Sequence, residues 1–292
     1  NTLSEKQRWL TVGKERRMAH PDNLWHTTVD QGTFDRYLKC YGPQWVRTRQ
    51  EGATQLVQLK PLAEFRFLLE EAGRFLMIQS EEITAKKIKG THQYEIHVNA
   101  TNIKELIHPQ PGHDIVRVIQ KNIDAIIQQR LLTGQAILPH LNHPNMRWSI
   151  TAEHLLAVKG LKFFEVYNGI PDTNTLGDTQ HASTERIWDI ILTVGLALGD
   201  RGVIYGLAVD DAHRYGKSVS KSMDAGRGWV VVRSTHLTPN SIILAMEKGN
   251  FYASTGVELV DINYEKNKLS IMIREQPGVH YNTEFIGSYI NC

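Results

Sequence analysis

Carboxylates and histidines recur close to the ends of short apolar runs in this sequence. The most suggestive, in chain order, are Glu82, His97, His143, Asp211 and His213. Imidazole and carboxylate ligands together suit Zn, Mn or Fe better than Ca. Bound ions lower the pKa of a shared water and clamp a phosphoryl oxygen, so these residue types indicate a metal-dependent hydrolase. A single histidine is more often a surface or packing residue, so the inference depends on these side chains meeting in space.

Signals for other chemistries are missing from the sequence. There is no glycine-rich phosphate loop and no Gly-x-Ser-x-Gly elbow, and neither Cys40 nor Cys292 has a base near it in sequence. The paired carboxylates of a carbohydrate-active barrel would not explain the accompanying histidines. With 33 basic and 31 acidic residues the net charge is +2, which gives no argument for a nucleic-acid partner. No apolar run is long enough to predict a membrane span.

The elements that must position these residues are centred on the stretch Ile137–Asn145. It begins as a buried strand would and ends in two histidines, with Pro144 stopping the ladder. The other expected strands are residues 75–78, 94–98, 163–167, 203–209 and 229–233, and the expected helices are residues 62–71, 114–132, 151–158 and one capped by Ser183. Alternation of strand and helix from about residue 62 to 200 predicts a parallel α/β sheet or barrel, with its site at the carboxyl ends of the strands.

The two ends of the chain have different patterns. Residues 4–12 are expected to form a short helix, and residues 13–54 a long, loop-rich excursion. After a helix that begins at Thr238-Pro239, the segment from Phe251 onward is rich in expected strands. We therefore predict a barrel domain at 1–255 and a β-rich extension at 256–292.

Five short motifs occur in one order along the chain. They are Ser-Glu-Glu82-Ile-Thr, His97-Val-Asn-Ala, Asn-His143-Pro-Asn, Phe-Glu165-Val-Tyr-Asn168-Gly and Asp-Asp211-Ala-His213. From about residue 60 onward the chain resembles the PHP (polymerase and histidinol phosphatase) superfamily. Gly-Arg227-Gly-Trp-Val-Val-Val-Arg and Phe251-Tyr-Ala-Ser-Thr-Gly resemble its stand-alone metal hydrolases, which carry a C-terminal β extension.

The resemblance implies a fold and an activity. The fold would be a distorted (β/α)7 TIM-like barrel holding up to three ions of Zn, Mn or Fe. It would be N-terminally truncated, because the family's Asp-x-His-x-His strand and Asp-His-Asn turn do not precede the first motif, and Asn1-Thr-Leu-Ser looks like the continuation of that turn. The implied activity is that of a phosphoesterase using a metal-bound hydroxide at a di- or trinuclear site. Alternatives are an amide, carbamate or ester hydrolase on the same site, or a non-catalytic, metal-stabilised binding module.

The resemblance also implies roles for single residues. Glu82 would bridge two ions, with Glu81 as the fallback, and His97 and His143 would complete one metal site. Asp211 would join Glu82 on a second ion and His213 would serve a third, so Glu82, Asp211 and His213 are the expected catalytic residues.

Substrate contacts are expected from three further residues. Glu165 and Asn168 lie at a strand end, where they would touch substrate or where Glu165 would bond a ligand histidine. Arg227 is either a clamp for phosphate or carboxylate or a surface arginine in a glycine turn. His140 supports the site from behind or simply packs. We expect a small, phosphorylated substrate; the sequence indicates neither compartment nor oligomeric state.

Overall fold

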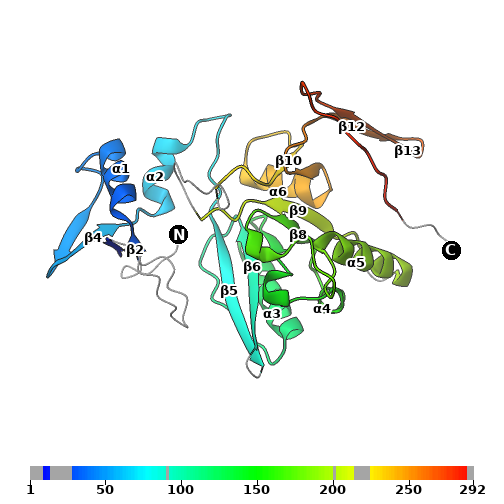
Figure 1. Ribbon diagram of the computed structural model, residues 1–292, viewed down its shortest axis with the longest axis horizontal. Coiled ribbons are helices and arrows are strands. Elements are labelled where there is room, and N and C mark those ends of the chain that lie inside the picture. Colours follow the sequence, from blue (N-terminus) through cyan, green and yellow to red (C-terminus); the bar gives the residue numbers. More distant parts are fainter. Residues whose placement is uncertain (1–8, 14–27, 90–91, 200–201, 214–223, 288–292) are drawn as a thin grey trace. The chain divides into compact units, whose positions relative to one another are not determined.

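The protein comprises two compact units, Asn1–Gln79 and Ser80–Cys292 (Figure 1). The structure, a computed structural model, describes residues 9–13, 28–89, 92–199, 202–213 and 224–287. No helix in these ranges combines the length and the apolar character needed to cross a membrane.

The first unit is a small α/β unit. Its sheet has the order β2-β1-β4-β3. The elements are β1 (Trp9–Val12), β2 (Thr28–Val29), α1 (Gln31–Tyr41), β3 (Thr48–Glu51), β4 (Thr54–Gln58) and α2 (Leu62–Leu69). Helix α1 begins where the Asp30 carboxylate accepts the N–H of Thr33 at 2.9 Å. Phe34, Val46 and Val57 form the unit's core.

Two expectations for this unit are wrong within the described residues. Of the helix expected at residues 4–12, residues 4–8 lie outside the described residues, and residues 9–12 form strand β1 instead, because aromatic and β-branched side chains favour a strand that can pair with β4. Residues 13–54 were expected to be loop-rich, but their described part contains helix α1 and strand β3, which pairs with β4. The scattered glycines and aromatics concealed the helix in the sequence.

The second unit is built on a five-stranded mixed sheet in the order β5-β6-β7-β8-β9. Its strands are β5 (Ser80–Lys89), β6 (His92–Thr101), β7 (Leu138–Leu141), β8 (Phe163–Asn168) and β9 (Tyr205–Val209). The pairs β5–β6 and β6–β7 are antiparallel, whereas β7–β8 and β8–β9 are parallel. Among the described residues β5 and β9 each pair with one strand only, so the sheet is open at both edges.

The expected TIM-like barrel is therefore wrong. A (β/α) barrel needs parallel strands joined by helical crossovers and a sheet that closes on itself. Here β5 and β6 form a hairpin, and only the segment from β7 to β9 follows the expected strand–helix alternation. Residues 75–78 are not a strand either, since the only pairing there is an isolated bridge between Glu71 and Phe75. The two carboxylates Glu81 and Glu82 thus lie near the start of β5 instead of just past a strand.

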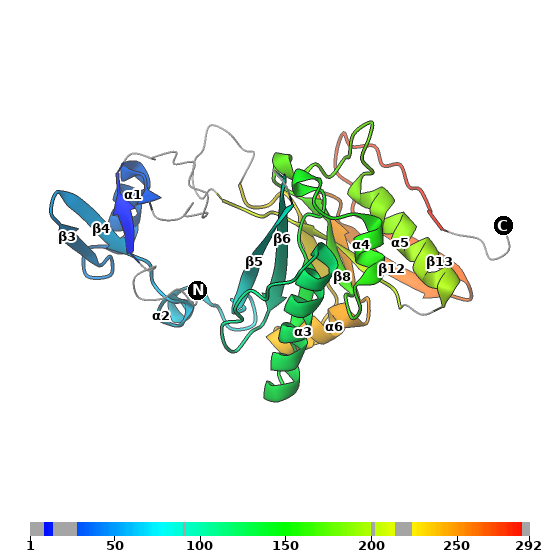
Figure 2. The same cartoon turned by 90° about the horizontal axis from the view of Figure 1, so that it is seen from below.

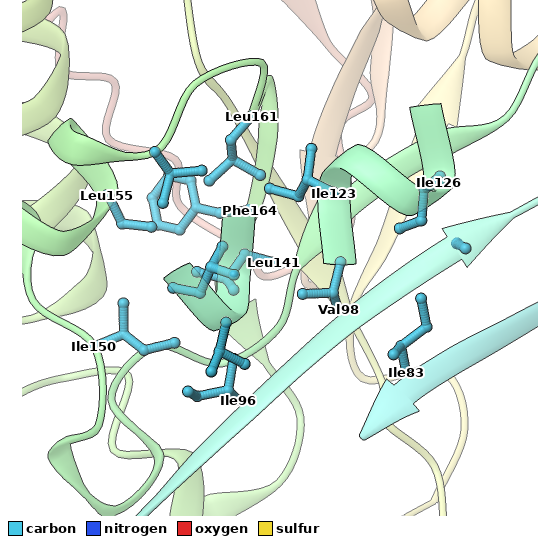
Figure 3. Packing of buried hydrophobic residues seen from close by; sticks show 14 of the residues in the cluster. Ile83, Ile96, Val98, Ile123, Ile126, Leu141, Ile150, Leu155, Leu161 and Phe164 are labelled. Atoms are coloured by element: carbon cyan, nitrogen blue, oxygen red, sulfur yellow. The ribbon is translucent and has the colours of Figure 1, made fainter. Parts of the chain in front are cut away.

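One face of the sheet carries the main core (Figure 3). Ile96, Val98, Leu141 and Phe164 are fully buried there. This face is covered by helices α3 (Ile115–Thr133), α4 (Ala152–Ala157) and α5 (Thr184–Leu198) (Figure 2). Their apolar side chains belong to the same core cluster as those of the strands. The helices expected at residues 62–71, 114–132 and 151–158 and after Ser183 are confirmed as α2, α3, α4 and α5, and the expected ends differ from the observed ones by no more than two residues. The helix expected to begin at Thr238-Pro239 is confirmed as α6 (Pro239–Glu247).

The opposite face divides into an apolar and a polar part. Neighbouring strand residues point to opposite faces, so Phe163 faces away from Phe164 and packs with α6 (Pro239–Glu247) and β11 (Phe251–Ser254). Strand β10 (Trp229–Val232) pairs with β11. Strands β12 (Leu259–Glu265) and β13 (Lys268–Ile273) form a separate antiparallel pair. The remainder of this face carries polar residues, among them Glu82 and His97.

Candidate metal centre

Strand pairing brings Glu82, His97 and the end of β7 together. In the β5–β6 register Glu82 lies opposite Asn99, and His97 lies opposite Thr84. The chain leaving β7 stays beside β6, because the N–H of Asn142 donates to the carbonyl of His97 at 3.1 Å. Glu82 and His97 each neighbour a core residue in sequence, so the pleat directs both away from α3, α4 and α5 and onto the same face.

Three side chains converge on this face. Glu82, His97 and His143 each offer one ligand atom, and these atoms lie within 4.8 Å of one another. Glu82 Oε1 is 3.0 Å from His97 Nδ1 and 3.9 Å from His143 Nε2. The two imidazole rings meet edge to face, with centroids 4.9 Å apart.

These distances fit a divalent cation. Ligands held at about 2.1 Å in a tetrahedron are about 3.4 Å from one another, so the trio needs only small side-chain rotations to reach that geometry. His143 is 3% exposed and its Nδ1 has no hydrogen-bond partner among the described residues, so the ring is held by packing instead of hydrogen bonds. Glu82 keeps 39% of its side-chain surface exposed, which leaves the centre open to solvent and substrate.

The structure separates the two adjacent carboxylates of β5. Glu81 points to the opposite face from Glu82, where its Oε1 accepts the N–H of Ile107 at 2.8 Å. Burial raises the pKa of the Glu81 carboxyl, and that hydrogen bond opposes the rise. Glu82 is thus the carboxylate available to the two histidines.

Charges within the trio reinforce one another. Burial opposes ionisation of Glu82, but the hydrogen bond to His97 and the charges of the nearby histidines outweigh it and lower the pKa of its carboxyl. Burial likewise opposes protonation of His97, yet its contacts with Glu82 and Glu95 raise the pKa of the imidazole to about 9. At neutral pH a cation binding here must therefore displace a proton from His97.

Asp211 and His213 lie beside the trio without joining it. Asp211 Oδ2 accepts a hydrogen bond from Asn168 Nδ2 at 3.1 Å, and His213 Nδ1 lies 2.7 Å from the Asp211 carbonyl oxygen. Burial raises the pKa of the Asp211 carboxyl, the hydrogen bond from Asn168 opposes this, and the charges of Glu82 and Glu165 add to the rise. Asp211 also has φ = +49°, a strained value for a residue with a side chain.

Glu165 lies beneath the centre and not at its surface. It is 1% exposed, and its Oε2 accepts the backbone N–H of His143 at 2.8 Å and the side-chain amide of Asn168 at 2.9 Å. Its Oε1 is 3.3 Å from Nε2 of the buried His140. Sequence reasoning considered a contact with substrate or a bond to a ligand histidine, and the structure shows a bond to His143, made by its backbone N–H.

Arg227 is held next to the end of β8. Its turn is fixed by Asp210, whose carboxylate accepts the N–H groups of Arg227 and Gly228 at 2.6 and 2.9 Å. A Cβ added to Gly169 would lie 3.2 Å from the Arg227 Cβ and 2.6 Å from the Asp210 carbonyl oxygen, so only glycine allows this close approach.

Sequence reasoning missed three residues at this centre. Asn142 donates from Nδ2 to Glu82 Oε1 at 2.9 Å, Asp210 builds the Arg227 turn, and the buried Glu95 faces His97. Glu95 could have been found from the sequence, because two residues along a strand return to the same face. Asn142 and Asp210 act through tertiary contacts that no sequence pattern signals.

Comparisons of the chain with protein-family models, with curated proteins and with solved structures find no match. The interpretation of this centre therefore depends on its geometry and chemistry.

Proposed function

We propose that this protein is a metal-dependent hydrolase whose ion is held by Glu82, His97 and His143. The observation that carries the proposal is the convergence of one carboxylate and two imidazoles within 4.8 Å on a solvent-accessible part of the sheet. This ligand set suits Zn, Mn or Fe. Three protein ligands leave coordination positions for water and substrate, as in catalytic sites, whereas structural zinc sites are closed by four.

A bound divalent ion would supply Lewis acidity and an activated water. The protein's own side chains would position the substrate and transfer protons. Glu82, buried His143 and His97 would fix the position of the reacting atoms. Asp211 lies beside the trio, where its carboxyl group could exchange a proton with the substrate, and a hydrogen bond from Asn168 fixes its orientation.

A phosphate ester is the proposed substrate class. Its support is the resemblance of the motifs to the PHP superfamily, together with the position of Arg227. The Asp210 turn holds this arginine against Gly169, one residue beyond Asn168. A guanidinium group can donate two hydrogen bonds to a phosphate, so Arg227 could bind the phosphate group of a substrate that also contacts the ion.

Metal content is the first test. The protein and its Glu82→Ala variant are loaded with zinc or manganese, desalted and analysed for metal per chain. We expect about one equivalent or more in the unaltered protein and a loss in the variant. Glu81→Ala is the matched control, since it removes a neighbouring carboxylate that faces Ile107 and should keep the metal. Equal metal in all three proteins would contradict the assignment of the ligands.

Hydrolysis is the second test. An aryl phosphate, an aryl ester and an aryl carbamate are offered to the metal-loaded protein. We expect turnover of the phosphate that disappears in Glu82→Ala. Turnover of the ester or carbamate alone would overturn the substrate class. Metal binding without turnover of any of these three substrates would contradict the proposed enzymatic activity and favour a metal-stabilised binding module.

A further inference from the structure

A second carboxylate faces the other nitrogen of the His97 ring. Glu95 lies two residues before His97 on β6, so both side chains point to the same face. Glu95 Oε2 is 3.7 Å from His97 Nε2, on the side of the ring away from Glu82. Neither atom has a hydrogen-bond partner among the described residues, and Glu95 is only 4% exposed. A small rotation of either side chain would bring the two atoms into hydrogen-bond range.

The rest of the Glu95 side chain is fixed from behind. Gln93 Nε2 donates to its Oε1 at 2.7 Å, and Arg147 Nε lies 3.6 Å from the same oxygen. The backbone N–H of Glu95 donates to Ser149 Oγ at 2.9 Å. Arg147 belongs to the short helix Met146–Trp148, and its φ of +52° is a value that residues with a side chain rarely adopt. These contacts occupy Oε1 and leave Oε2 directed at the imidazole.

We propose that Glu95 is a positioning residue that accepts the Nε2–H of His97 and thereby keeps Nδ1 available to bind the metal ion. The inference rests on the proposed function, because it assumes a cation at the Glu82–His97–His143 trio. A neutral imidazole has one proton and two possible positions for it. With the proton on Nδ1, the Nε2 lone pair would face a buried carboxylate, which is repulsive. With the proton on Nε2, that nitrogen donates to Glu95 and the Nδ1 lone pair points at Glu82 and the ion.

The consequence is a loss of metal affinity when Glu95 is changed. Removing the carboxylate partner of a metal-binding histidine typically costs 10- to 100-fold in affinity. Glu95→Gln keeps an oxygen that can accept the Nε2–H, so we expect a loss of about 10-fold. Glu95→Leu keeps the approximate volume but offers no acceptor, so we expect a loss nearer 100-fold. A role in packing alone would not produce this graded order.

The test measures zinc affinity by competition with a chelator for the full chain, Glu95→Gln and Glu95→Leu. Glu81→Gln is the matched control, since it neutralises the carboxylate on β5 that faces the other side of the sheet. Urea unfolding without metal identifies any variant that has lost its fold. Folded variants that bind zinc as tightly as the unaltered protein would overturn the inference.

A spectroscopic measurement separates positioning from general stabilisation. Nitrogen-15 spectra of the zinc-loaded, histidine-labelled protein show which ring nitrogen of His97 carries the proton, with His97→Asn used to assign the signal. We expect a proton on Nε2 and zinc on Nδ1. Zinc on Nε2 would overturn the inference while leaving the metal centre in place. Absence of zinc binding in the unaltered protein would overturn the proposed function, and this inference with it.

Discussion

Replacing Glu165 with alanine should destabilise the second unit strongly without touching its apolar core. The carboxylate is buried beneath the candidate centre and accepts hydrogen bonds from the backbone of His143 and from the amide of Asn168. Burial opposes its ionisation, but the hydrogen bond with His140 and the charges of His140 and His143 lower the pKa of the Glu165 carboxyl. At neutral pH it is therefore a charged acceptor at the ends of β7 and β8.

The magnitude follows from the donors left behind. Glu165→Ala leaves two buried N–H donors without an acceptor, and each such loss costs about 1–3 kcal/mol. The sum is about 4 kcal/mol, which agrees with the roughly 3–5 kcal/mol lost when one partner of a buried charged pair is removed. Glu165→Gln keeps one oxygen and can preserve one or both hydrogen bonds on that side, so a loss of about 1–2 kcal/mol is expected.

Urea unfolding followed by circular dichroism measures these losses. Because the chain has two compact units, Ile123→Ala is included to mark the transition of the second one, since Ile123 is fully buried in its core. Glu105→Ala, at an exposed glutamate, should change the free energy of unfolding by no more than about 0.5 kcal/mol. A loss below about 1 kcal/mol for Glu165→Ala would refute the reasoning, because it would mean that these donors find other partners.

Two further predictions concern the same part of the sheet. Since the folded pKa of His97 is about 9 and its ordinary value is 6.5, the folded chain retains a proton that the unfolded chain has lost between these values. The contribution of this proton to the free energy of unfolding is on the order of 2 kcal/mol, given the partial exposure of Glu82. It should be complete below pH 6.5 and lost as the pH rises through 9. Urea midpoints measured in a chelator should therefore fall between these pH values, and an equal fall in His97→Asn would show that His97 is not the group responsible. Gly169→Ala should cost about 1–3 kcal/mol, because the new methyl group meets the Asp210 carbonyl oxygen at 2.6 Å. Thermal melting measures this loss, and an unchanged melting temperature would show that the Arg227 turn moves freely.

Local signals were sufficient for most single elements of the second unit. The helix predicted at residues 114–132 is α3, because Asp114 caps its first turn through the N–H of Arg117 and Gly134 ends it in the left-handed conformation. The near-continuous apolar run from Val203 to Val209 predicted strand β9, and the run Phe163–Tyr167, interrupted only by Glu165, predicted strand β8. Caps, glycine stops and periodicity involve residues close in sequence, so they can be recognised without the fold.

Errors arose where neighbours distant in sequence decide the outcome. Residues 9–12 form a strand because β4, more than 40 residues later, pairs with it. The apparent barrel failed for a related reason: strand–helix alternation does not specify whether successive strands run parallel. The hairpin between β5 and β6 turns the pairing antiparallel and leaves the sheet open.

The sequence by itself determined which chemical groups are available and roughly where strands place them, because residue type and pleat are local properties. It therefore indicated Glu82, His97 and His143 as candidate ligands before any contact was known. Only the tertiary structure decided that Glu82 and not Glu81 faces the histidines, since this depends on the register between β5 and β6. The strand period already places Glu95 on the same face as His97, but only the tertiary structure revealed that its Oε2 lies 3.7 Å from His97 Nε2, because that distance depends on side-chain direction.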